Sequence, residues 1–94
     1  MMDYRLLYSE TSRKQIKALH PDIKPVIKSR LQKLKSNPYT SKELQRELSG
    51  YYSLRARRFR IIYKINGNDK VLEVHSVGHR KDIYEVFRES LVNS

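Results

Sequence analysis

The sequence predicts an α+β fold in which a mostly antiparallel sheet packs against helices on one of its faces. Residues 51–77 contain three strand-like segments separated by short turn sequences, a pattern typical of neighbouring antiparallel strands. Residues 10–36 and 81–92 carry apolar residues at helical spacing instead. With a short strand at the start, the expected order is β-α-α-β-β-β-α, in one small domain over residues 1–94.

The first strand and the first helix are predicted from a weak alternation and two boundary signals. Asp3–Tyr8 alternates weakly and is expected to form a strand, and Ser9 can cap a helix over Glu10–Leu19. His20-Pro21 ends this helix because the residue before a proline avoids the α conformation.

The second helix is predicted by a stripe of apolar residues behind a capping aspartate. Asp22 caps it, Pro25 is tolerated because it falls in the first turn, and Asn37-Pro38 ends it. Lysines off the apolar stripe form a basic face that is either simply solvated or available to a polyanion. The stripe consists of Ile23, Val26, Ile27, Leu31 and Leu34.

Turn signals delimit the remaining elements. Residues 39–49 are predicted to be a polar connection with a helical turn through Glu43–Leu48. Arg57 and Arg58 lie at one turn, and Asn66–Asp69 forms a strong second turn. The three strands are expected at Tyr51–Ala56, Phe59–Ile65 and Lys70–Val77, and the last helix at Lys81–Val92.

Composition limits the class of function. The formal net charge is +10 and the pI is near 10.0, which predicts salt-sensitive binding to a polyanion. Nucleic acid, an anionic membrane surface and an acidic protein are all compatible with this charge. The absence of cysteine excludes disulfides and suits the cytoplasm, and neither a signal peptide nor a transmembrane segment is recognisable. With three glycines and scattered carboxylates, no cofactor or metal site is expected.

Arginines gather on the central hairpin. No acidic residue occurs over residues 50–68, so these cations face no local acid. Arginine suits phosphate because its planar fork donates paired hydrogen bonds and stays charged. Strand alternation places Arg55 and Arg60 together on the open face, where they bind phosphate or, alternatively, serve solubility or pair with Glu73. The hairpin arginines are Arg55, Arg57, Arg58 and Arg60.

The junction between the last strand and the last helix carries further candidates. Arg80 lies beside a helix N-terminus that attracts anions, and Tyr84 follows at the i,i+4 spacing that brings side chains together. His79 is a candidate proton carrier because imidazole titrates near neutral pH. Tyr84 is also compatible with a place at the edge of the core. His75 shares strand parity with His79 but lies roughly 13 Å away, too far for both to hold one metal ion.

Three segments carry a family resemblance: Leu48–Arg55 (LSGYYSLR), Arg58–Tyr63 (RFRIIY) and Val77–Tyr84 (VGHRKDIY). The chain resembles the RelE/ParE superfamily of toxins from type II toxin–antitoxin modules. The resemblance covers nearly the whole chain and implies a RelE-like fold. The superfamily includes both ribosome-dependent mRNA interferases and poisons of DNA gyrase.

For the RelE branch, the resemblance implies an endoribonuclease that cleaves mRNA in the ribosomal A site, without a metal or cofactor, and so inhibits translation. The ribose 2′-OH attacks the adjacent phosphate and the 5′-oxygen leaves, which requires a base and cations for the developing charge. The candidates for catalysis are Arg60, Arg80, Tyr84 and His79. The candidates for RNA binding are Arg55, Arg57, Arg58, Lys64, Tyr51 and Lys81.

One departure from the RelE pattern leaves the general base open. The best-known RelE enzymes carry lysines on the strand before the hairpin turn, where this chain has Tyr51 and Ser53. Either Tyr84 or His79 replaces the lysine, since nearby cations favour the anionic form of a tyrosine, or the activity is weak. The other interpretations are a ParE-like gyrase inhibitor without nuclease activity and an inactive relic.

All of these interpretations share one partner. The resemblance implies an acidic, RelB-like antitoxin that forms a toxin–antitoxin hetero-oligomer and covers the basic cleft or shifts the last helix. An acidic, partly disordered segment matches the charge of +10. The interferase interpretation adds mRNA and the ribosome as partners, and none involves a membrane.

Overall fold

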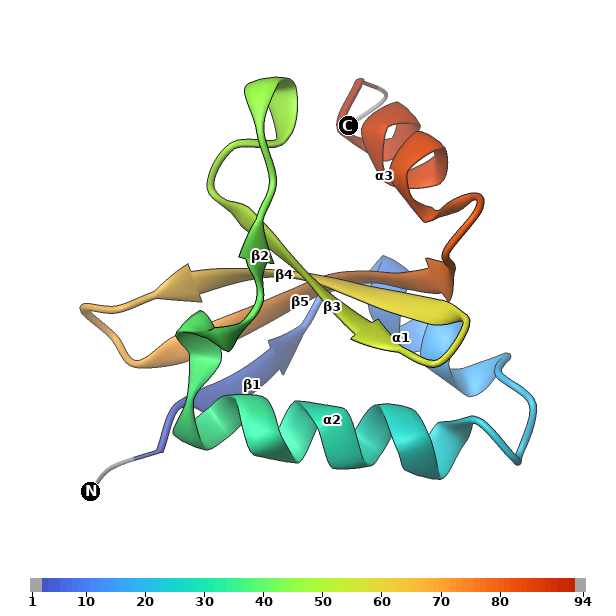
Figure 1. The fold of residues 1–94 in the computed structure, drawn as a ribbon, viewed down its shortest axis with the longest axis horizontal. Helices are drawn as coiled ribbons and strands as arrows, with labels where there is room; N and C mark the ends of the chain where they lie inside the picture. The colour runs from blue at the N-terminus through green and yellow to red at the C-terminus, as the bar shows by residue number, and fades with distance from the viewer. Residues whose placement is uncertain (1–2, 93–94) are drawn as a thin grey trace.

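The computed structural model describes residues 3–92, which contain five strands, three α-helices and two short 3₁₀ helices (Figure 1). The strands are β1 (Arg5–Tyr8), β2 (Lys42–Glu43), β3 (Tyr51–Ala56), β4 (Phe59–Asn66) and β5 (Val71–His79). The helices are α1 (Glu10–Lys17), α2 (Lys24–Ser36) and α3 (Ile83–Val92), and the 3₁₀ helices are η1 (Pro38–Thr40) and η2 (Arg46–Leu48). Every predicted strand and helix is present. The two-residue strand β2 was not predicted, and the helical turn expected through Glu43–Leu48 is shortened to η2.

The five strands form one sheet in the order β1-β5-β4-β3-β2. All neighbours are antiparallel except β1 and β5, which are parallel. The predicted mostly antiparallel α+β fold is therefore confirmed. Because β3, β4 and β5 follow one another through short turns, the basic hairpin lies beside the strand that leads into α3.

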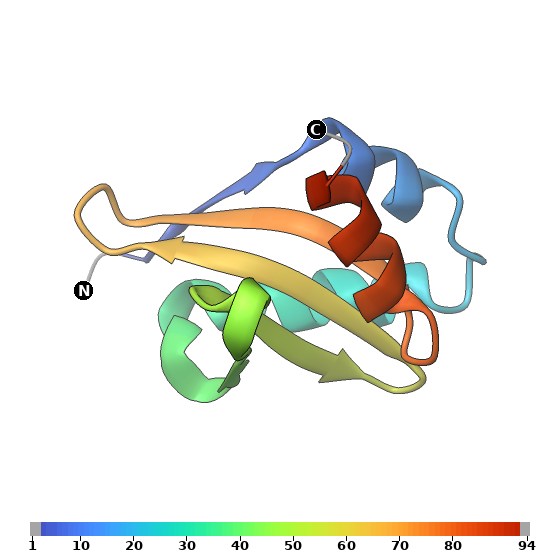
Figure 2. The same ribbon diagram turned by 90° about the horizontal axis from the view of Figure 1, so that it is seen from above.

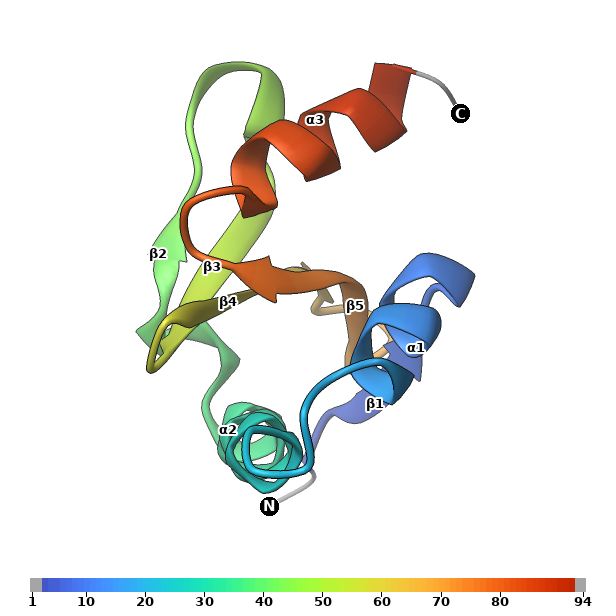
Figure 3. The same ribbon diagram turned by 90° about the vertical axis from the view of Figure 1, so that its right-hand side faces the viewer.

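Helices cover both faces of the sheet, so the expectation of helices on one face was wrong. On one face, Ile27 and Leu31 of α2 join a core with Ile61 and other residues of the sheet. On the opposite face, α3 lies over Ile62 of β4 (Figure 3). Ile61 and Ile62 are adjacent and both fully buried, and adjacent strand residues point to opposite faces. A second covering element is therefore required.

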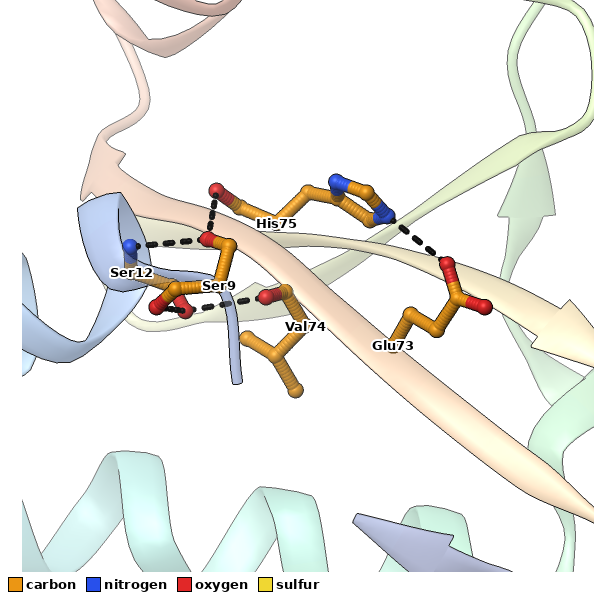
Figure 4. Close-up of polar contacts among 5 residues, drawn as sticks. All are labelled: Ser9, Ser12, Glu73, Val74 and His75. Carbon is orange, nitrogen blue, oxygen red and sulfur yellow. Dashed lines mark hydrogen bonds and ion pairs between the residues drawn. The ribbon is translucent and has the colours of Figure 1, made fainter. Parts of the chain in front are cut away.

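Where β1 ends, helix α1 and its capping residue supply hydrogen bonds to the backbone of β5. Ser9 caps α1 as predicted, accepting a 3.0 Å hydrogen bond from the Ser12 backbone N–H. The Ser9 hydroxyl donates to the His75 carbonyl at 3.1 Å, and the Ser12 hydroxyl donates to the Val74 carbonyl at 2.9 Å (Figure 4). The Val77 N–H donates to Oε1 of Gln15 at 2.7 Å. These bonds satisfy the His75 carbonyl and the Val77 N–H, which lie beyond the end of β1, and give the Val74 carbonyl a second donor besides the Ser9 N–H.

A β-bulge in β5 reverses the alternation of its side chains. Ile62 is opposite Ser76 and Tyr63 is opposite Val74, so His75 is the additional residue. As a result, the His75 ring contacts Phe87 on the α3 face, with ring centres 6.2 Å apart. His79 is instead opposite Phe59, which packs against the core on the α2 face. The equal parity predicted for His75 and His79 was therefore wrong.

Within the described residues, no helix has the length and apolar character required to span a membrane.

Candidate functional site

Three polar side chains from β3, β4 and α3 meet on the face covered by α3. Oη of Tyr84 and Oγ of Ser53 share a hydrogen bond of 2.9 Å. Nη1 of Arg60 donates to the same Ser53 hydroxyl at 3.4 Å. Ser53 is only 2% exposed, whereas Arg60 and Tyr84 are half-buried. We call Ser53, Arg60 and Tyr84 the polar cluster, in which Arg60 and Tyr84 both contact the Ser53 hydroxyl.

Apolar packing of α3 brings Tyr84 over the sheet. Ile83 and Phe87 are buried with Ile62, Leu44 and Leu48, and α3 crosses β4 and β5 near the end of β5 (Figure 2). Because Ile83 and Phe87 lie one turn apart, they anchor one face of the helix. Tyr84 lies in the turn of α3 between these two anchored residues, and its phenol reaches Ser53 on β3.

Gly78 allows this close approach at the start of α3. Gly78 is opposite Arg60 on the neighbouring strand, and cross-strand partners lie on the same face. A Cβ atom at this position would lie 2.9 Å from Cδ1 of Ile83, closer than carbon atoms pack. The absence of a side chain at residue 78 therefore lets the first turn of α3 settle beside Arg60.

An ion pair ties α3 to η2 farther along the helix. Nε of Arg88 lies 2.8 Å from Oε1 of Glu47. A hydrogen bond from its own backbone, together with the neighbouring Arg88 guanidinium, holds the pKa of Glu47 below its ordinary value. Both side chains are about half exposed, so solvent weakens the attraction. The buried apolar residues of α3 contribute most of its docking energy.

Arg80 lies in the turn before α3 rather than on the helix. The Val86 N–H donates to the Asp82 carbonyl at 3.0 Å, and α3 begins at Ile83, two residues later than predicted. The helical i,i+4 argument for Arg80 and Tyr84 therefore does not apply. Instead, the Arg80 N–H donates to the Arg58 carbonyl at 2.7 Å. This bond joins the β5–α3 turn to the tip of the basic hairpin, and the Arg80 side chain is exposed there.

The structure does not bring His79 into the polar cluster. Its ring packs edge-on against Phe59, with ring centres 5.8 Å apart, on the face opposite Arg60. Its Nδ1 accepts a 3.3 Å hydrogen bond from the Lys81 backbone N–H. Of the two bases considered from the sequence, only Tyr84 touches the cluster.

The remaining RNA-binding candidates divide into exposed cations and one packed aromatic residue. Arg55, Arg57, Arg58, Lys64 and Lys81 are exposed. Tyr51 is half-buried and packs against Phe87 of α3, with ring centres 4.9 Å apart. Lys64 extends its ammonium group over the Tyr51 ring at 5.6 Å from the ring centre. Tyr51 therefore helps to hold α3 on the sheet.

The cations of this region have no carboxylate partners among the described residues. Glu73, the acid considered for pairing with the arginines, instead contacts Nε2 of His75 at 3.2 Å (Figure 4). No group of three or more His, Asp or Glu side chains within residues 3–92 is arranged to hold a metal ion. Among the described residues, the hairpin arginines and Arg80 therefore offer positive charge without an ion pair beside a phenol and a hydroxyl, whereas Lys64 lies opposite Glu73 on β5.

The sequence did not reveal the role of Ser53, which was noted only as a position without a lysine. The available signal was its alternation with Tyr51 and Arg55, which places a small polar residue on the same face as Arg60. Its hydrogen bond to Tyr84 depends on where α3 docks, and strand alternation does not contain that information.

Comparison with known proteins identifies the family to which the chain belongs. Residues 3–84 match the family described as the ParE toxin of type II toxin–antitoxin system, parDE. Toxin RelG of Mycobacterium tuberculosis is 32% identical over 85 residues, which cover 88% of this chain and 98% of RelG.

Solved structures have the same fold. The toxin–antitoxin complex RelBE2 from Mycobacterium tuberculosis includes a chain with a TM-score of 0.76 and 29% identity, covering 83% of this chain and 99% of that chain. A mutant of E. coli toxin RelE in the free state has a TM-score of 0.79 and 23% identity, covering 98% of both chains. At that identity the second likeness concerns the fold alone. The match over residues 3–84 and the identity with RelG show that the chain belongs to the RelE/ParE family of toxins from type II toxin–antitoxin systems.

Proposed function

We propose that this toxin is a ribosome-dependent mRNA endoribonuclease that inhibits translation. The observation that carries the proposal is the polar cluster, in which the Tyr84 phenol and the Arg60 guanidinium meet at the Ser53 hydroxyl. A tyrosine in its phenolate form can take a proton, and a fixed cation beside it favours that anion and binds phosphate. These are two of the functions that cleavage by a ribose 2′-OH requires.

The cluster suggests a division of roles. Tyr84, acting as the phenolate, accepts the proton of the 2′-OH as the 2′-oxygen forms its bond to phosphorus. The bond to the 5′-oxygen then breaks, leaving a cyclic phosphate, and the 5′-oxygen takes a proton from the solvent. Arg60 stabilises the charge that develops on the phosphate, and Arg80 adds charge from the adjoining turn, because a guanidinium stays protonated. Ser53 orients the Tyr84 phenol through its 2.9 Å hydrogen bond.

This assignment accounts for the missing lysines. Tyr51 and Ser53 stand where RelE-like enzymes carry them, so no lysine amine is available as a base on β3. Within the cluster, Tyr84 is the group suited to serve as the base, because the Arg60 guanidinium stays protonated. His79, on the opposite face, is left without a role in proton transfer by this proposal.

The family match to ParE supports a second candidate function, inhibition of DNA gyrase without nuclease activity. In that case the exposed arginines would contact a protein or DNA and the polar cluster would serve only to hold α3. Accumulation of DNA cleavage by gyrase in the presence of the toxin would identify this function.

We further propose that the toxin is neutralised in the cytoplasm by an acidic, RelB-like antitoxin. Relatives have been crystallised with RelB, including the intact E. coli RelBE complex. A net charge of +10 and unpaired arginines favour an acidic partner through long-range attraction. Co-purification at increasing salt tests this: binding should weaken as the salt concentration rises.

The decisive experiment is primer extension on a defined message in a cell-free translation reaction. New 5′ ends inside codons that are absent from naked RNA are expected with the wild-type toxin. Arg60→Ala and Tyr84→Phe should abolish or strongly reduce them, whereas Arg5→Ala, which removes an exposed charge from β1, should not. An intact message with folded wild-type toxin, or full cleavage by the Arg60→Ala, Tyr84→Phe double variant, contradicts the proposal.

A further inference from the structure

A shallow hollow lies on the face of the sheet opposite the polar cluster. It has a volume of about 180 Å³ and is lined by Ile23, Arg57, Arg58 and Phe59. The β3–β4 turn and the N-terminal end of α2, which form its two sides, lie at the same end of the molecule (Figure 1). An apolar floor with two arginines at its rim is not explained by the proposed chemistry of the polar cluster.

The aromatic part of this hollow is fixed in place. Phe59 is half-buried, packs against the core on the α2 face and meets the edge of the His79 ring at an interplanar angle of 68°. An aromatic ring that lines the hollow and is held at its edge by His79 is suited to an aromatic ligand.

The rim is strongly cationic. Arg57 and Arg58 are exposed, and residues 50–68 contain no acid. Arg57 has a φ angle of 58°, in the left-handed region that side chains rarely adopt. Arg46 and Lys70 have similar φ angles, and Arg57 and Arg58 differ from them in lining the hollow.

We infer that this hollow binds an unpaired nucleobase of RNA, stacked on Phe59, with its flanking phosphates on Arg57 and Arg58. Aromatic faces combined with arginines are the recognition chemistry of single-stranded nucleic acid. An acidic peptide would match the charge, but it would leave the apolar floor unused. The inference rests on the proposed function, because it requires an RNA ligand.

The position of the hollow connects it to the polar cluster. Phe59 and Arg60 are consecutive on β4 and face opposite sides of the sheet, so a bound strand would pass around the end of the hairpin. The bond from the Arg80 N–H to the Arg58 carbonyl lies at that crossing. The base therefore belongs to a nucleotide near the cleaved bond or to ribosomal RNA beside it.

Binding to RNA that cannot be cleaved tests the inference separately from catalysis. Ribosomes are programmed with a message carrying 2′-O-methyl groups in the A-site codon, and dissociation constants are measured for the full chain. Phe59→Leu retains an apolar side chain and removes the aromatic face, whereas Phe59→Tyr retains both. Thermal unfolding of each variant checks that the core is intact.

We expect Phe59→Leu to weaken binding roughly 5- to 100-fold and Phe59→Tyr to bind as the wild type does. The same loss on ribosomes without message would assign the base to ribosomal RNA, and loss only on programmed ribosomes would assign it to the message. Unchanged binding by a folded Phe59→Leu variant overturns the inference and leaves the proposed function standing. A Phe59→Leu variant that loses affinity for the antitoxin but not for ribosomes likewise overturns the inference and leaves the proposed function standing. Absence of binding by the wild type removes the proposed function as well.

Discussion

Replacing Ser53 with alanine tests whether the polar cluster is a catalytic unit. The substitution removes a 2.9 Å hydrogen bond to Tyr84 and a weaker 3.4 Å bond from Arg60, and leaves the backbone of β3 in place. Tyr84 and Arg60 are half-buried, so water can replace the lost partner. We therefore expect the free energy of unfolding to fall by only about 1 kcal/mol, the net contribution of an ordinary hydrogen bond.

The effect on cleavage should be larger than the effect on stability. If Ser53 orients the phenol, its loss removes part of the contribution of Tyr84, for which general base catalysis sets a ceiling of roughly 100- to 10,000-fold. We expect a decrease of about tenfold in the single-turnover cleavage rate on programmed ribosomes, equivalent to about 1.4 kcal/mol. Urea denaturation of the same preparations gives the stability for comparison.

A double-mutant cycle with Tyr84→Phe decides whether Ser53 acts through Tyr84. Once the phenol hydroxyl is gone, Ser53→Ala should have almost no further effect on the rate, because the two groups act as one unit. The matched control is Ser90→Ala, whose hydroxyl donates to the Phe87 carbonyl within α3. Equal rate losses from Ser53→Ala with and without the Tyr84 hydroxyl would refute the reasoning.

Three further predictions concern stability. Gly78→Ala should lower the free energy of unfolding by about 1–3 kcal/mol, because the new Cβ lies 2.9 Å from Cδ1 of Ile83; an unchanged urea midpoint would contradict this. Burial raises the pKa of Tyr63, so the folded state holds its proton more tightly and stability should be lost as pH rises above 10.0. In pH-dependent denaturation, Tyr63→Phe should reduce that loss of stability at alkaline pH. At neutral pH it should lower the free energy of unfolding by about 1–3 kcal/mol, because the Pro38 carbonyl loses the 2.7 Å hydrogen bond from the phenol. Arg57→Gly should raise the thermal midpoint by relieving a left-handed backbone, a strain of about 1–2 kcal/mol, while weakening RNA binding; a lower midpoint would show that Arg57 is not strained.

Local sequence signals located most of the elements because they act over a few residues. Ser9 caps α1 and Arg57 and Arg58 form a turn, as expected, and the turn predicted at Asn66–Asp69 is found one residue later, at 67–70. The start of α3 was misplaced because Lys81 and Asp82 are charged residues that fit the polar positions just before the apolar helical pattern. They instead lie in a turn closed by the Asp82 N–H, which donates to the His79 carbonyl at 3.0 Å, and the bond from the Arg80 N–H to the Arg58 carbonyl joins this turn to the hairpin.

The sheet faces were harder to predict because alternation assumes an uninterrupted strand. The bulge at His75 moves every later residue of β5 to the other face. This shift separates His79 from Arg60, and it also places Gly78 under Ile83. A bulge depends on pairing with the neighbouring strand and with α1, so a single strand sequence does not reveal it.

The sequence alone determined the fold class, the positive charge, the arginine hairpin and the candidates Arg60, Arg80 and Tyr84, because each depends on residue type, spacing or resemblance. The tertiary structure decided which candidates meet. Docking of Ile83 and Phe87 onto Ile62 brings Tyr84 to Ser53, and the same sheet carries His79 away to the other face. The physical reason is that a site made from β3, β4 and α3 depends on packing between segments up to 31 residues apart, which no local pattern encodes.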